Sequence, residues 1–117
     1  MGRIDGLLPS IPTLLVLKVL EVGPAHGYEI ARRVELASQA TLALKEGTLY
    51  PLLYKLEREG LVSAEWQGGP SARRVRVYTL TEAGRGRLAE GRGEWQVRSR
   101  GVSRVLQLGE ALARGPA

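Results

Sequence analysis

The chain is 117 residues long, which is enough for one domain with a modest core. It has no cysteine, which excludes disulfides and thiolate metal sites, and no phenylalanine, so its core must be mostly aliphatic. Seventeen Lys and Arg against twelve Asp and Glu give a formal net charge of +5, and this balance favours a polyanionic partner such as nucleic acid or an anionic membrane surface.

The spacing of apolar residues predicts three helices in the first half of the chain. Residues 11–22 are apolar around most of a helical wheel and are followed by Gly23-Pro24, so we expect a largely buried helix that stops there. A second helix is expected from His26-Gly27 to about Ser38, with one apolar side. The third lies in GTLYPLLYKLEREG, residues 47–60, with Gly60 as its C-terminal cap.

The third helix is predicted to have an unusual outer face. Its leucines at 49, 52, 53 and 56 fall within about 100° of one another and form the core face. Tyrosines with Lys and Arg on the opposite face suit DNA, where cations meet phosphates or guanine edges and a tyrosine ring can meet a thymine methyl. An ordinary core helix with an aromatic outer side is the alternative. The outer face and its flanks hold Thr48, Tyr50, Pro51, Tyr54, Lys55 and Arg58.

Pro51 lies where a proline could break this helix. If Thr48 is the N-cap, Pro51 falls in the first turn, where its missing N–H has no internal partner to lose. We therefore expect the helix to begin near Thr48, or to have a loosened first turn. A start at Glu46 is instead expected to produce a kink at Pro51.

A β-hairpin is predicted after Gly60. Residues 61–66 and 73–80 contain β-branched and aromatic residues, and QGGPSA between them is rich in turn formers. Arginines 73, 74 and 76 lie on the second strand, within a segment, Pro70 to Arg104, that holds nine arginines and only three glutamates. A solvated arginine-rich surface is the alternative to a polyanion site.

Thr79 or Thr81 is the expected N-cap of a last helical segment. Leu88, Trp95 and Val102 are spaced by seven, as are Val105 and Leu112, which predicts an interface with a second copy. Each of the glycines in this segment costs about 1 kcal/mol within a helix. We therefore expect the helix to be held by its partner or to be interrupted. These glycines are Gly84, Gly86, Gly91, Gly93, Gly101 and Gly109.

The order helix, helix, helix, hairpin, helix is that of a winged helix-turn-helix, an α+β fold. We expect a DNA-binding domain over residues 1–80 and a C-terminal dimerisation helix over 81–117. The third helix would enter the major groove, and the wing arginines would straddle neighbouring phosphates.

The chain resembles the PadR family of bacterial transcriptional regulators over residues 12 to about 83. The resemblance rests on GPAHGYEIARRVE, GTLYPLLYKLEREGLV, EW and RRVRVYTLTEAG. It implies a homodimeric winged-helix protein, usually a repressor, and a short member with a single C-terminal helix. Two departures are Lys45-Glu46 where the family often has Ser-Pro, and RRVRVYTL where a run like RRKYY is usual.

The resemblance also draws attention to Trp95. In multidrug-binding short PadR members, a tryptophan at the matching place, in an ESW-like context, stacks planar ligands between the two subunits. Here the context is GEW. A planar aromatic effector at Trp95 is therefore implied, and a packing role at the dimer interface is the alternative.

We therefore predict a sequence-specific regulator, a ligand-responsive repressor that binds an inverted-repeat operator in double-stranded DNA as a homodimer. Base contacts are expected from Thr48, Tyr50, Pro51, Tyr54 and Lys55. Phosphate contacts are expected from Tyr28, Arg58, Arg73, Arg74, Arg76 and Tyr78.

Other classes explain the sequence less well. A non-specific architectural DNA-binding protein would need only charge, not a patterned helix face. MarR-type proteins lack GTLYP, and a protein-interaction module would not explain the arginines of the wing. An enzyme would depend on His26, whose place at a helix start favours capping, and we expect no cofactor and no metal site. No secretory signal is visible and residues 11–22 are too short to cross a bilayer, so we expect a cytoplasmic protein.

Overall fold

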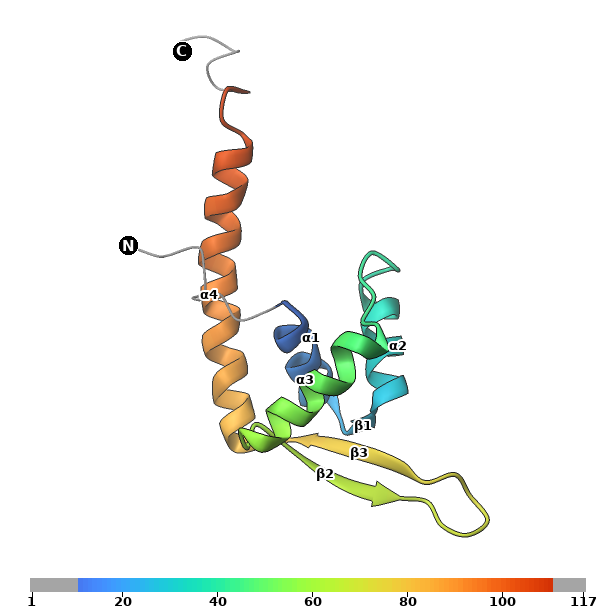
Figure 1. Cartoon of the computed structure of the whole chain (residues 1–117). Helices are drawn as coiled ribbons and strands as arrows, with labels where there is room; N and C mark the ends of the chain where they lie inside the picture. The colour runs from blue at the N-terminus through green and yellow to red at the C-terminus, as the bar shows by residue number, and fades with distance from the viewer. Residues whose placement is uncertain (1–10, 111–117) are drawn as a thin grey trace.

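The computed structural model describes residues 11–110. They form helices and a small antiparallel sheet (Figure 1). The elements in chain order are α1 (Ile11–Val22), β1 (Ala25–His26), α2 (Gly27–Ala37), α3 (Glu46–Arg58), β2 (Val62–Gln67), β3 (Val75–Leu80) and α4 (Glu82–Leu106). The strand order in the sheet is β1-β3-β2. This arrangement confirms the predicted α+β winged helix-turn-helix.

The first two helices follow the predicted bounds. α1 ends at Val22, before Gly23-Pro24, and α2 ends at Ser38 as its C-cap. His26 caps α2: its Nδ1 accepts the Glu29 N–H at 3.4 Å, and the Glu29 carboxylate accepts the His26 N–H at 3.2 Å. The capping role favoured by the sequence is confirmed.

α3 begins at Glu46 and its N-cap lies three residues earlier than predicted, so the expectation that Thr48 is the N-cap was wrong. Lys45 is the N-cap, and its side chain makes no capping bond. Its carbonyl accepts the N–H groups of Thr48 and Leu49 at 2.9 and 2.8 Å, so the backbone alone closes the first turn. Pro51 therefore lies inside the helix. It withholds a hydrogen bond from the carbonyl of Gly47, and its ring crowds that carbonyl. Gly47 is an exposed residue.

The predicted hairpin is present, and β1 adds a third strand that the sequence analysis did not find. The hairpin register runs from Val62 opposite Leu80 to Gln67 opposite Val75. β1 pairs with the edge of β3 that faces away from β2, with Ala25 opposite Tyr78 and His26 opposite Val77. Two residues are too short to show the alternation by which a strand is recognised. Arg73 and Arg74 lie just before β3, in the loop rather than in the strand.

The core is mostly aliphatic, as the lack of phenylalanine predicts. Its fully buried side chains come from both helices and sheet: Val16, Leu17, Ile30, Leu49, Leu53, Leu56 and Val62. Leu52 packs against this cluster while remaining partly exposed.

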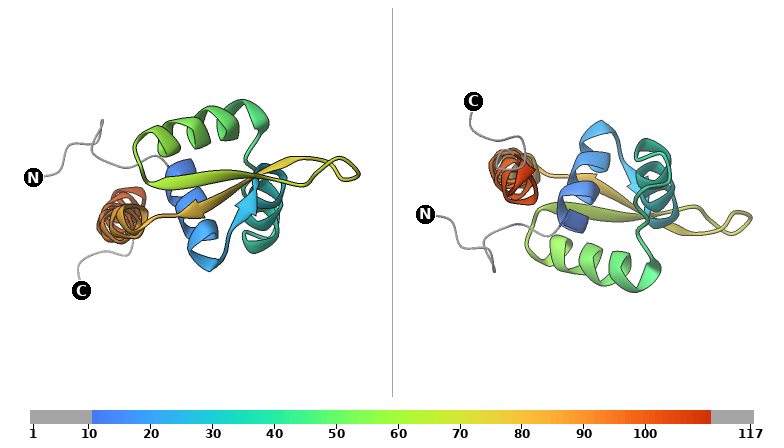
Figure 2. Two further views of the ribbon diagram at one scale, coloured as in Figure 1. Left: turned by 90° about the horizontal axis from the view of Figure 1, so that it is seen from below. Right: turned by 90° about the horizontal axis from the view of Figure 1, so that it is seen from above.

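α4 is continuous from Glu82 to Leu106 despite five of its glycines, so the possible interruption is not found within these bounds. The Thr81 hydroxyl accepts the Gly84 N–H at 3.1 Å and caps the helix, which confirms Thr81 among the two predicted caps. Gly84, Leu88 and Gly91 are buried, and α4 packs on α1. Seen along its axis in Figure 2, α4 stands at one edge of the body and the hairpin loop extends at the other. None of the helices described here has the length and apolar character needed to cross a membrane.

Candidate nucleic-acid interface

The outer face of α3 is formed as predicted. Tyr50, Tyr54, Lys55 and Arg58 are exposed, together with Thr48 and Pro51, whereas the leucines at 49, 53 and 56 face the core. The Arg58 guanidinium lies 5.5 Å from the centroid of the Tyr54 ring, within the range of a cation–π contact. The helix therefore presents aromatic rings and cations to solvent on one side.

The N-terminus of α2 lies beside this face. Tyr28 is exposed, and its ring stacks on that of His26 with 6.5 Å between centroids. The Tyr50 ring packs against Gly27, the first residue of α2. The two helices therefore bring Tyr28 and Tyr50 to the same side of the molecule, although 22 positions of the sequence separate them.

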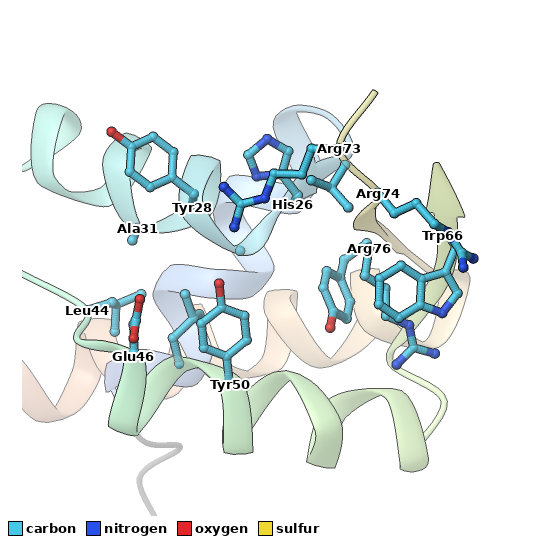
Figure 3. A pocket seen from close by; sticks show the side chains of 14 residues that line it. His26, Tyr28, Ala31, Leu44, Glu46, Tyr50, Trp66, Arg73, Arg74 and Arg76 are labelled. Atoms are coloured by element: carbon cyan, nitrogen blue, oxygen red, sulfur yellow. The ribbon is translucent and has the colours of Figure 1, made fainter. Parts of the chain in front are cut away.

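A groove of about 480 Å³ runs between α2, α3 and the hairpin. Figure 3 shows Tyr28 and Tyr50 on the helical sides of this groove, Arg74 and Arg76 with Trp66 on the other side, and Arg73 between the two groups. Glu46 is its acidic member. Arginines and aromatic rings around a single carboxylate suit a polyanion with planar groups. The lining residues used here are Tyr28, Glu46, Tyr50, Trp66, Arg73 and Arg74.

Trp66 was missed by the sequence analysis as a member of the site. It is 59% exposed on β2, and its ring lies 5.0 Å from the Arg74 guanidinium and 5.8 Å from that of Arg76. The register places Trp66 opposite Arg76. The EW and RR motifs are visible in the sequence, but only the folded hairpin shows that Trp66 contacts the arginines.

Two predicted phosphate-binding residues are placed differently from the other four. Tyr78 is 6% exposed and belongs to the core, and burial raises the pKa of its hydroxyl. A phosphate contact from its side chain does not fit this position. Arg76 donates to the Glu57 carboxylate at 2.7 Å, so it is already paired within the protein. Tyr28, Arg58, Arg73 and Arg74 are exposed.

The residues predicted for the dimer interface also include both buried and exposed side chains. Leu88 is 5% exposed and packs in the core of its own chain, so its expected place in an interface was wrong. Trp95, at 41% exposure, Val102 and Val105 are exposed, and all three follow the buried residues Gly84, Leu88 and Gly91 of α4. Leu112 lies outside the described residues.

Comparisons with known proteins agree with this geometry. The model of the "Transcriptional regulator PadR-like family" matches residues 16–90. A PadR family transcriptional regulator structure from Eggerthella lenta has a TM-score of 0.70 and 34% identity, over 82% of this chain and 81% of that one. Bacillus subtilis PadR in complex with operator DNA has a TM-score of 0.62 and 25% identity, over 68% of this chain and 45% of that one.

One curated relative is longer than this chain. The transcriptional regulator YqjI of Escherichia coli is 28% identical over 104 residues, which is 88% of this chain but 47% of that protein. The chain therefore spans about half the length of this relative.

Proposed function

The chain belongs to the transcriptional regulator PadR-like family, and we propose that it is a cytoplasmic, homodimeric repressor that binds an inverted-repeat operator and releases it when a small molecule binds. At the family level it is a DNA-binding transcriptional regulator and not an enzyme. The observation that carries the proposal is the outer face of α3, where Tyr50 and Tyr54 stand exposed with Lys55 and Arg58 beside a wing bearing arginines.

We assign the recognition of the DNA base sequence to α3. Thr48, Tyr50 and Pro51 would contact base edges in the major groove, because a recognition helix makes its base contacts near its N-terminus. Tyr54 and Lys55 lie further along α3 and would extend these base contacts toward its C-terminal half. Phosphates would be held from both sides of that helix. The residues assigned to phosphates are Tyr28, Arg58, Arg73 and Arg74.

Homodimerisation is supported by the distal half of α4. Trp95, Val102 and Leu106 lie on one side of the helix, and all are exposed in the single chain. A row of large apolar side chains left in water favours an interface. A two-fold dimer would place two recognition helices on half-sites about one helical turn apart.

An effector at this interface would act by changing the spacing of the two wings. Trp95 offers a half-exposed indole for a planar aromatic compound. Binding there would release the operator only if the two spacings differ in DNA affinity. Titration of planar aromatic compounds into Trp66→Phe protein, which reports on Trp95 alone, should change its fluorescence. Unchanged fluorescence would remove the effector from the proposal.

The DNA-binding proposal is tested by fluorescence anisotropy with the duplex directly upstream of the protein's own reading frame and a scrambled duplex, at two salt concentrations. We expect about a hundredfold preference for the upstream duplex, retained at the higher salt. Equal and steeply salt-dependent binding to both would favour the architectural alternative, or an operator elsewhere. Selection of bound genomic fragments would separate those two outcomes.

The dimer is tested by sedimentation velocity. Val102→Asp places a charge on the Trp95 side of α4 and should shift the protein to monomer. Val97→Asp is the matched control, because Val97 is equally exposed but lies on the other side of the helix at about 100° per residue. A dimer that survives Val102→Asp would contradict this interface.

A further inference from the structure

We propose that the Glu57–Arg76 ion pair fixes the wing against α3, so that Arg76 is a positioning residue for DNA binding and not a phosphate contact. The proposal rests on the assignment of α3 and the wing as the DNA interface. It replaces the role predicted for Arg76 from its place in the arginine-rich strand.

The ion pair joins two parts of the site that are otherwise far apart in sequence. Glu57 lies in the last turn of α3 and Arg76 on β3, and the Arg76 Nη2 to Glu57 Oε2 distance is 2.7 Å. The two side chains are 35% and 29% exposed. The other ion pairs among residues 11–110 connect positions three or four apart. Among these residues, the contact between Glu57 and Arg76 is therefore the ion pair that links elements distant in the sequence.

Arg76 also contacts Trp66, the aromatic residue against which Arg74 lies. Its guanidinium lies 5.8 Å from the Trp66 ring and 6.0 Å from the Tyr78 ring. Trp66 also contacts Arg74, whose guanidinium lies 5.0 Å from the ring centroid. A continuous series of contacts therefore runs from the recognition helix outward along the wing: Glu57, Arg76, Trp66 and Arg74. Figure 3 shows the last three of these side chains side by side.

The consequence of breaking the pair follows from the burial of Arg76. Its Nε is buried and has no hydrogen-bond partner, so Glu57 supplies the charge compensation seen for this guanidinium. Without the carboxylate, the cation would be left half-buried and would turn toward solvent. Trp66 would then lose one of its two cations, and the position of Arg74 relative to α3 would no longer be set.

The two roles for Arg76 predict opposite effects of removing Glu57. If Arg76 positions the wing, Glu57→Gln weakens DNA binding. If Arg76 is a phosphate contact that Glu57 holds back, the same change frees a cation, so DNA binds more tightly and the salt dependence becomes steeper. Any lost acidic charge also favours DNA at long range. Glu59→Gln controls for this effect, because Glu59 is exposed two residues later and forms none of the ion pairs found in residues 11–110.

The first measurement needs no DNA. In full-length protein labelled with 5-fluorotryptophan, the Trp66 resonance is assigned by its loss in Trp66→Phe. We expect this ¹⁹F resonance to shift in Glu57→Gln and Arg76→Lys but not in Glu59→Gln, because a lysine keeps the charge without the planar fork. Thermal melts confirm that each variant is folded. An unchanged Trp66 resonance in Glu57→Gln would overturn the proposal.

The second measurement is anisotropy with the upstream duplex and with a random duplex at low salt, so that binding is measurable even if the sequence-specific function is wrong. Glu57→Gln should bind about fivefold more weakly than Glu59→Gln. The double variant with Arg76→Gln should be no weaker than Arg76→Gln alone, and the salt slope of Arg76→Gln should equal that of the parent. Tighter binding by Glu57→Gln, or a slope lowered by Arg76→Gln, would overturn the proposal. Equal affinity for the two duplexes in the parent would count only against specific recognition.

Discussion

The Tyr50 ring of α3 lies against Gly27 of α2, so closely that a Cβ on Gly27 would come within 2.7 Å of the Tyr50 hydroxyl oxygen. The contact places the ring at the rim of the groove between the two helices. The absence of a Cβ matters here for the position of the Tyr50 ring and not for the backbone conformation, because Gly27 is an ordinary first residue of a helix.

Gly27→Ala should displace the Tyr50 ring and weaken operator binding by about threefold to tenfold. The atom that must move is the far end of a half-exposed side chain, so the free energy of unfolding should change by less than about 1 kcal/mol. Anisotropy and urea unfolding measure the two quantities. Gly86→Ala, where an added Cβ meets open space on α4, is the control and should leave DNA binding unchanged. Parent-like operator affinity in Gly27→Ala would contradict the role of Tyr50.

Arg74→Ala should weaken binding to specific and random DNA by similar factors and reduce the salt slope by about one per bound protomer. Arg74 is exposed at the base of the hairpin loop, where a phosphate can reach it. Anisotropy at several salt concentrations gives the slope. Arg104→Ala removes the same charge near the end of α4, and its slope should stay at the parent value. A loss confined to the specific duplex would show that Arg74 reads bases.

Gly84→Ala should destabilise the protein by about 1–3 kcal/mol, since the new Cβ would run into the backbone carbonyl of Leu61 and the Leu80 side chain. Backbone cannot move aside as a side-chain end can. Gly86→Ala, two residues later and in open space, should stabilise the helix by about 1 kcal/mol. Urea unfolding of both variants checks the opposite signs. Similar changes in the free energy of unfolding of both variants would mean that α4 does not pack against Leu61 in solution.

The buried Tyr78 should make stability depend on alkaline pH. Desolvation raises its folded-state pKa above the ordinary value of 10.0, so folding favours the protonated hydroxyl. The stability is fully present below about pH 10 and is lost as the pH rises through the raised pKa. Urea unfolding at about pH 8 and about pH 11 should show a larger loss in the parent than in Tyr78→Phe, which differs from it only in lacking this hydroxyl. Equal losses would place Tyr78 in contact with solvent.

Helical periodicity and turn chemistry were sufficient to predict most of the fold. α1 and α2 end where Gly23-Pro24 and Ser38 indicate, and Thr81 caps α4. The start of α3 was predicted wrongly, because a side-chain cap was assumed where the Lys45 carbonyl closes the turn by itself. β1 was missed, because a two-residue strand exists only through its pairing with β3.

The sequence by itself determined the family, the winged helix-turn-helix and the face of α3 that points outward, because these depend on local spacing and on motifs. Tertiary structure alone decided which cations remain free. Arg73, Arg74 and Arg76 look alike in the sequence, yet Arg76 is paired with Glu57 and stacked on Trp66. The burial of Tyr78 and Leu88 was likewise decided by the tertiary structure. Burial depends on which elements pack over a residue, and no local sequence pattern contains that information.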